Sequence, residues 1–391
     1  MKKIFAPKPI IITGLIFILM FVLPLIPINC GFLSPVSNAL RDFDVYDIVY
    51  SRLLEEQTVD TNIVIVNIGD LSRKELSKEI ELLNKFQPAV IGIDALFLSP
   101  KSVSDDSLLS AALSKCHNLV MVNKLDDFSE NTKRFGTVHS SLINFSRYSS
   151  GGYANLPNED EVGFRTIREF RPKEIVNDTL VLSFAAKISD IYRHGALNKL
   201  LARDNRNETI NFRGNYNRFY FLDTRQFNDP AVDFRFIKDK IILMGYMGPD
   251  LQTKTLEDVF FTPLNERYAG KSFPDMYGIV IHANIISMIL NGNYINLMPL
   301  WISYLLAIII CFLNVKMIMA ICAKYKDWFN ALTKLFMLIF TVANLFLSLE
   351  ILHYFNYRIN LTLALFAIVL GNSVREFYDS FIHKILHKLL K

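Results

Sequence analysis

Four apolar runs in this sequence are long enough to cross a lipid bilayer, and they constrain the fold more than any other feature. A spanning helix needs about 20 mostly apolar residues to cross about 30 Å of hydrocarbon. The runs cover residues 9–28, 297–320, 335–353 and 358–374. The composition agrees, because only 20% of the residues are charged, against about a quarter in soluble domains. We therefore predict four α-helical transmembrane segments, with Asn344 as the expected interhelical hydrogen bonder.

The first run could instead be a cleavable signal peptide, which would have small residues before its cleavage site. This run ends in Pro27-Ile28-Asn29-Cys30, which offers no such site. Asn29 also occupies the position where a lipoprotein signal requires a small residue. A retained membrane anchor is the favoured interpretation.

Positive charge sets the predicted orientation of the four spans. Cytoplasmic loops and tails of membrane proteins carry an excess of Lys and Arg. We therefore place residues 1–8 and 375–391 in the cytoplasm of a cell with an inner membrane, and residues 29–296 outside it. The charges gather in three places: Lys2, Lys3 and Lys8 before the first run, Lys324, Lys326 and Lys334 between the second and third, and Arg375, Lys384, Lys388 and Lys391 after the fourth.

The large segment between the first and second spans has the pattern of an α/β domain. Residues 31–60 predict a helical stalk. Apolar runs without polar alternation indicate strands covered on both faces, as in a mostly parallel sheet with helices on both faces. We predict strands at 63–68, 89–94, 118–125, 208–214 and 240–246, and helices at about 72–86, 105–113, 179–193 and 278–292.

Acidic residues follow three of the predicted strands. Asp70 and Asp94 come at or after the ends of the first two, and Asp250 follows the strand at 240–246. Ligands of open α/β sheets bind at the carboxyl ends of strands. The alternative is that Asp70 and Asp94 cap the following helices or turns.

Known catalytic and metal motifs give no further site. The segment AGKSF at 269–273 lacks the first glycine of a phosphate-binding loop. GYMGPD at 245–250 has the wrong spacing for a dinucleotide fingerprint and is better explained as a structural turn. Neither a nucleophile elbow nor an HExxH pair is present, and the four cysteines form no disulfide or zinc framework. We expect no catalytic residue, metal or cofactor.

The strand and helix segments together resemble a known family. In order and spacing they are similar to the second type of CHASE domain (cyclases/histidine kinases associated sensory extracellular). The similar segments are IVIVNIGDLS (63–72), PAVIGIDALFLSP (88–100), LPNEDEVGFRTI (156–167), INFRG (210–214), 238–264 and 276–292. The most specific positions are Gly245, Asp258, Thr262, Pro263, Gly278, His282, Ala283 and Asn284; Asp160, Gly163 and Arg165 would be the family's Asp-Gly pair and arginine. The sequence departs from the pattern at Asn67 and Gly69 and in the long 163–178 segment.

The resemblance implies an external sensory domain with one span before it and three after it. It adds Arg213 and His282 to Asp70, Asp94 and Asp250 as candidate ligand-binding residues, although a packing role is favoured for His282. Family members often continue into a cytoplasmic output domain, whereas only residues 375–391 follow the last predicted span.

The favoured function is therefore a non-enzymatic sensor or receptor that passes its signal to a separate cytoplasmic partner. In the tail, Phe377 and Phe381 recur at helical spacing, and Lys384 and Lys388 lie on the remaining faces, an amphipathic pattern that favours lipid headgroups over a docked partner. Two alternatives stay open: an envelope scaffold subunit, and an extracytoplasmic enzyme using Asp70, Asp94 and Asp250. The expected partners are the lipid bilayer, a cytoplasmic or membrane protein and a small-molecule cue, with a homo-oligomer left open and no nucleic acid.

Overall fold

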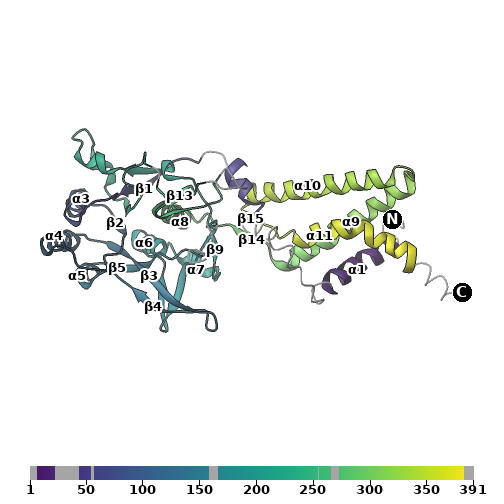
Figure 1. Cartoon of the computed structure of the whole chain (residues 1–391), viewed down its shortest axis with the longest axis horizontal. Coiled ribbons are helices and arrows are strands. Elements are labelled where there is room, and N and C mark those ends of the chain that lie inside the picture. The colour runs from purple at the N-terminus through teal and green to yellow at the C-terminus, as the bar shows by residue number, and fades with distance from the viewer. Residues whose placement is uncertain are drawn as a thin grey trace. The chain divides into compact units, whose positions relative to one another are not determined.

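The structure is a computed structural model that describes residues 7–22, 44–53, 57–157, 166–253, 255–265 and 273–382. The chain divides into two compact units. Tyr50–Ile295 form an α/β domain, and Met1–Val49 with Asn296–Lys391 form a helical unit. Figure 1 shows the elements of each unit.

The α/β domain is built on one nine-stranded sheet. Its core is five neighbouring parallel strands, in the order β10 (Phe219–Leu222), β1 (Asp60–Asn67), β11 (Ile241–Gly245), β2 (Val90–Asp94) and β3 (Leu119–Ser129). The sheet continues through β4 (Arg134–His139), β7 (Lys173–Val176) and β8 (Thr179–Leu182), and β5 (Ser150–Tyr153) pairs with β3. The predicted mostly parallel α/β fold is confirmed.

Helices cover both faces of the parallel strands (Figure 1). α3 (Arg73–Lys85) and α4 (Val103–Ser114) pack on one face, and α6 (Phe184–Tyr192) and α8 (Gly278–Asn291) on the other. Side chains of successive residues in β1 point to opposite faces of the sheet. Val64 and Val66 belong to the core with α3 and α4, and Ile63 and Ile65, on the other face, are also fully buried. Two-sided burial explains why the strand sequences are continuously apolar.

Glycine lets α6 approach the sheet closely. A Cβ atom added to Gly92 would lie 2.5 Å from Cδ1 of Ile188 and 2.9 Å from Cζ of Phe184. Gly245 likewise faces α8, where an added Cβ would lie 2.6 Å from Cβ of Ile279. Only glycine fits between strand and helix at this spacing.

Two predicted elements of the α/β domain are wrong. Residues 179–193 are not one helix: β8 pairs with β7 through a turn at Asn177 and Asp178, both with positive φ, and α6 begins only after the Ser183 N-cap. The strand predicted at 208–214 is reduced to β9 (Glu208–Thr209), because the amides of Asn211, Arg213 and Gly214 bond to side chains of α8 instead of a neighbouring strand. The remaining short elements are η3 (Val49–Leu53), α5 (Ile143–Ser146), β6 (Glu169–Phe170), α7 (Asn198–Ala202), η4 (Tyr216–Arg218), η5 (Thr224–Asn228), η6 (Phe234–Ile237), β12 (Val259–Phe260) and β13 (Met276–Tyr277).

Among the residues that the structure describes, the helical unit contains two helices that are long and apolar enough to cross a membrane. They are α9 (Leu300–Lys324), with a mean hydropathy of 2.5, and α10 (Phe329–Phe355), with 2.2. α1 (Pro7–Val22) is a shorter apolar helix, and residues 23–28 of the first predicted span lie outside the described residues. The last predicted span starts too early: Tyr357–Arg358 form β15, which pairs with β14 (Asn296–Leu297), and α11 covers Thr362–Phe377 before η7 (Tyr378–Ile382).

α1, α9 and α11 pack around a shared apolar core that includes Ile12, Cys311 and Ala367. Asn314 is fully buried in this core and donates a hydrogen bond from Nδ2 to the carbonyl of Ile368, 3.1 Å away. Asn314 therefore makes an interhelical hydrogen bond, whereas the predicted Asn344 bonds to Phe340 within its own helix.

Candidate functional site

At the carboxyl edge of the sheet, Asn67 joins the turns that follow three strands. Its amide is 1% exposed and lies in register with Gly245, which in turn pairs with Asp94. Nδ2 donates to Asp223 Oδ1 at 2.9 Å and to the carbonyl of Gly248 at 3.1 Å. Oδ1 accepts from the amides of Gly69 at 3.0 Å and Met247 at 2.8 Å. A fully bonded side chain therefore fixes this edge.

The three candidate aspartates lie at this same edge, as predicted. Asp70 is exposed, and Asp94 ends β2. Asp250 closes a turn by accepting from the amides of Gln252 at 3.0 Å and Thr253 at 2.8 Å, and it pairs with Arg225 at 2.9 Å. The pKa of Asp250 is lowered from its ordinary value, chiefly by the hydrogen bond from the main-chain amide of Thr253.

Helix capping at this edge falls to serines. Ser72 caps α3 in a capping box with Glu75, and Ser102 caps α4. Asp70 and Asp94 therefore do not cap these helices, although the alternative role in a turn stays open for them, and Asp70 itself lies in the turn after β1. Within the described parts of the chain, no group of three or more His, Cys, Asp or Glu side chains could hold a metal ion.

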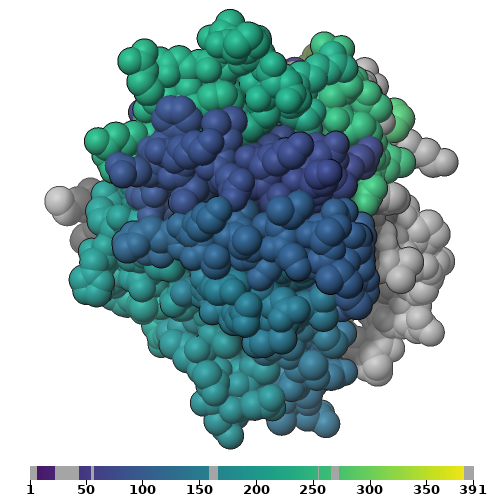
Figure 2. Space-filling model, turned by 90° about the vertical axis from the view of Figure 1, so that its left-hand side faces the viewer, coloured from purple at the N-terminus to yellow at the C-terminus, as the bar shows by residue number. Residues whose placement is uncertain are grey.

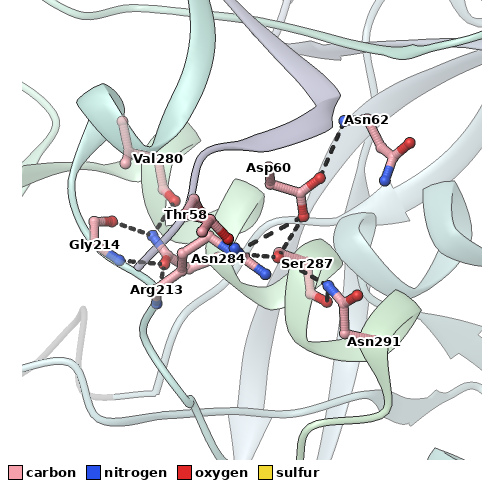
Figure 3. A network of polar contacts seen from close by, with 9 residues as sticks. All are labelled: Thr58, Asp60, Asn62, Arg213, Gly214, Val280, Asn284, Ser287 and Asn291. Atoms are coloured by element: carbon pink, nitrogen blue, oxygen red, sulfur yellow. Dashed lines mark hydrogen bonds and ion pairs between the residues drawn. The ribbon is translucent and has the colours of Figure 1, made fainter. Parts of the chain in front are cut away.

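Arg213 belongs to a different network, at the start of β1 (Figure 3). Ser287 of α8 donates from Oγ to Asp60 Oδ2 at 2.6 Å. Nε of Arg213 donates to Ser287 Oγ at 3.0 Å and lies 4.0 Å from Asp60 Oδ2. A second guanidinium nitrogen donates to the carbonyl of Thr58 at 2.6 Å. The network thus ties the segment that leads into the domain to the helix that leads out of it.

Asn284 completes this connection between α8 and residues 213–214. Its Oδ1 accepts from the amides of Arg213 at 2.8 Å and Gly214 at 3.2 Å (Figure 3). Its Nδ2 donates to the carbonyls of Gly214 and Val280, each at 2.9 Å. Asn284 is fully buried, so the amide replaces the strand partner that this segment lacks.

His282 packs in the core between α8 and α6. It is 4% exposed, and its ring meets the ring of Phe184 edge-on with centroids 5.3 Å apart. Burial lowers the pKa of His282 to about 4, so the imidazole is neutral at physiological pH. The structure does not bring Arg213 or His282 together with the three aspartates.

Cations hold the chain where it leaves α8, a feature that the sequence did not reveal. The helix ends at Gly292 with φ 62°, and Lys199 Nζ donates to the carbonyl of Gly292 at 2.8 Å. Arg203 donates to the carbonyl of Ile295 at 2.7 Å, and Arg193 donates to that of Leu290. Positive charge at a helix C-terminus is favourable. Because the acceptors are main-chain carbonyls, no side-chain pattern in the sequence marks them.

In the helical unit, the loop after α10 holds both segments that flank the domain. Arg358 pairs with Asp44, and the hydroxyl of Tyr46 bonds to the carbonyl and amide of Ile359. On the other side, the amide of Asn296 donates to the carbonyl of Asn356 at 2.7 Å, and that of Met298 to Arg358 at 2.9 Å. Residues 356–359 are therefore a common anchor for both linkers.

The tail begins with the two predicted aromatic contacts exposed. The side chains of Phe377 and Phe381 are 57% and 60% exposed and stack with ring centroids 5.8 Å apart. Asp379 pairs with Lys8 of α1 at 2.5 Å and with Arg375 at 3.4 Å. Lys384 and Lys388, like the predicted Asp160, Gly163 and Arg165, lie outside the described residues.

Comparison with known proteins supports one family. No curated protein and no solved structure matches the chain. The family model of the CHASE2 domain matches residues 15–317, which include the whole sheet, α8 and both networks. The chain belongs to the CHASE2 family of sensory domains.

Proposed function

We propose that this chain is a membrane-bound extracytoplasmic sensor or receptor. The observation that carries the proposal is the Asp60–Ser287–Arg213 network, which links the incoming strand to the outgoing helix inside a sensory-family domain. A domain joined to a membrane unit at two points transmits a change through those two points. A network that fixes them together is what such transmission requires.

The common anchor at residues 356–359 supports the same function from the helical side. It bonds to the incoming linker through Arg358 and to the outgoing linker through β14 and β15. A shift of either linker therefore acts directly on α10 and α11. We propose that the signal then passes to a separate cytoplasmic or membrane protein and that the chain itself performs no catalysis.

The proposed topology has four spans, with both termini in the cytoplasm and the α/β domain outside. The lengths and hydropathies of α9 and α10 support two of these spans. α1 and α11 share an apolar core with α9, which supports placing them in the same bilayer. The positive charges at the N-terminus, in the α9–α10 loop and in the tail support the orientation.

The topology is tested with single cysteines in a background without the native ones. Leu98→Cys lies on the domain, where Leu98 is 60% exposed, and Tyr325→Cys lies between α9 and α10, where Tyr325 is 44% exposed. A membrane-impermeant maleimide should label only Leu98→Cys on intact spheroplasts and both after permeabilisation. Labelling of Tyr325→Cys alone in intact spheroplasts would overturn the proposal.

Sensing is tested on the full chain in mild detergent, with fractions of envelope extract as the source of the cue. A sensor should show a shift in its thermal unfolding midpoint with at least one fraction, and Ser287→Ala should change that shift. The envelope-scaffold alternative predicts no shift with any fraction and a fixed complex that copurifies in constant ratio. The absence of any shift, together with such a fixed complex, would contradict the sensor proposal.

A further inference from the structure

Glu79 is a buried acid that none of the networks above uses. It lies on α3, its side chain is 7% exposed, and its Oε2 is shielded from solvent without a hydrogen-bond partner. A buried carboxylate without donors or a cation is costly. Natural proteins retain such a group rarely, and a carboxyl that binds a proton removes the cost.

The cover over this part of α3 is the segment after β10. Phe227, Phe234 and Ile237 of this segment pack against the core that contains Ile80 and Leu83 of α3. The rings of Phe86 and Phe234 are 6.0 Å apart. In Figure 2 the violet-blue atoms of the α3 region border the sea-green atoms of the segment that follows β10. Because Phe86 follows Glu79 by seven residues, about two helical turns, the two lie on the same face of α3, and we infer that this segment, distant in sequence, lies over Glu79.

The charges that act on Glu79 are both negative. They come from Glu75 on the same helix and from Asp223 at the junction of β10 and η5. Two cations of the covering segment, Arg225 and Arg235, are paired with Asp250 and Asp233. The pKa of Glu79 is raised to about 8, mainly by burial and secondly by the repulsion from these two carboxylates.

Asp223 connects Glu79 to the carboxyl edge of the sheet. Its Oδ1 accepts from Asn67 Nδ2 at 2.9 Å, and its Oδ2 accepts from the amide of Leu251 at 3.5 Å. Asn67 is the residue that joins the turns after β1 and β11. A negative charge on Glu79 would repel the carboxylate of Asp223, so ionisation of Glu79 would weaken the contacts that hold these turns together.

We propose that the proton is a cue for this domain: Glu79 binds a proton in the closed structure, and its ionisation loosens the contact between α3 and the segment after β10. The inference rests on the proposed function for its external setting, where the proton comes from the extracytoplasmic fluid. At low pH the neutral carboxyl is accommodated under the cover. At high pH the carboxylate is drawn toward water, and the cover and the Asp223–Asn67 contact open.

The stability consequence has a definite sign. The folded state holds the proton of Glu79 more tightly than the unfolded state, whose pKa stays near 4.5. The contribution to stability is therefore full below about pH 4.5 and is lost as the pH rises through about 8. An alkaline shift thus favours the open state.

The test uses the full chain in lipid nanodiscs, as wild type, Glu79→Gln and Glu81→Gln. Glu81 is the matched control, because it lies on the same helix but is exposed and paired with Lys115 at 2.7 Å. Infrared difference spectra should show a protonated-carboxyl band that disappears with a midpoint near pH 8 in the wild type and in Glu81→Gln. The band should be missing from Glu79→Gln, and any signal from Asp275, whose pKa is raised by burial, should be the same in all three proteins.

The second readout is the thermal unfolding midpoint between about pH 6.5 and about pH 9. It should fall with rising pH in the wild type and in Glu81→Gln, and stay nearly level in Glu79→Gln. Equal pH profiles for wild type and Glu79→Gln, or no difference in the carboxyl band, would overturn the inference while leaving the sensor proposal intact. If instead the labelling experiment places the domain in the cytoplasm, the sensor proposal and the external source of the proton both fail. The protonation of Glu79 and its effect on stability are still measured independently by the two readouts above.

Discussion

Ser287 donates a hydrogen bond to Asp60 across 227 positions of sequence, at 2.6 Å and in a buried setting. The carboxylate belongs to the first residue of β1, and the hydroxyl to the last part of α8. With Arg213 as the third member, the contact joins the two ends of the domain that lead to the helical unit. The contact therefore links the buried interior of the domain to the two segments that connect it to the helical unit.

Removing the hydroxyl should therefore destabilise the domain. Ser287→Ala leaves the carboxylate of Asp60, which is only 6% exposed, without its short hydrogen bond. We expect a loss of about 1–3 kcal/mol in the free energy of unfolding, measured by denaturant titration of the full chain in detergent. Ser110→Ala, which removes an exposed hydroxyl bonded to the carbonyl of Asn144, should change it by less than about 0.5 kcal/mol. Equal effects of the two changes would contradict the importance of the network.

The approach of α6 to β2 should not tolerate a methyl group at Gly92. Gly92→Ala places a Cβ 2.5 Å from Cδ1 of Ile188 and should cost about 1–3 kcal/mol of stability. Ile188→Val removes that Cδ1 and alone should cost about 0.5–1.5 kcal/mol. The double variant should lose less stability than the sum of the single losses. Strict additivity in a double-mutant cycle would show that the two residues do not share this contact.

Arg203 should be needed to keep Glu208 buried. Glu208 is 2% exposed, and its carboxylate receives Nε of Arg203 at 2.8 Å and a second guanidinium nitrogen at 3.1 Å. Arg203→Met should cost about 3–5 kcal/mol because it leaves a buried charge unpaired. Adding Glu208→Gln should recover part of that loss. Hydrogen exchange at residues 292–296 should rise in Arg203→Met, since the bond to the carbonyl of Ile295 is also removed. Unchanged exchange there would argue against a clamp on the outgoing segment.

His282 should contribute an acid-side dependence of opposite sign to that of Glu79. Its folded pKa of about 4 is below the ordinary value of 6.5, so the unfolded state binds the proton first. The stability that depends on neutral His282 is full above about pH 6.5 and is lost as the pH falls toward about 4. His282→Leu should flatten the fall of the unfolding midpoint across that range, whereas replacing the exposed His139 with Leu should not. A slope unchanged in His282→Leu would show that another group titrates there.

Local sequence was sufficient for most elements of the core. The runs at 63–68, 89–94, 118–125 and 240–246 predicted β1, β2, β3 and β11 because two-sided burial demands unbroken apolar sequence. The ends of these strands predicted a common edge for Asp70, Asp94 and Asp250, since parallel strands place their carboxyl ends together. The apolar runs at 297–320 and 335–353 likewise predicted the two long apolar helices α9 and α10.

Contacts between distant segments decided the rest. Residues 179–182 have a pattern that suits a helix, yet pairing with β7 makes them a strand, because cross-strand packing outweighs local preference. Arg213 lies beside Asp60 instead of beside the aspartates because Asn284 of α8 holds residues 213–214 there. Glu79 has an ordinary place on an amphipathic helix, and only the tertiary packing around α3 makes it a buried acid. The sequence by itself thus determined the elements that have a local cause: buried strands and long helices follow from unbroken apolar runs and apolar periodicity. The tertiary structure alone decided which polar groups meet and which are buried, because partners hundreds of residues apart leave no local pattern.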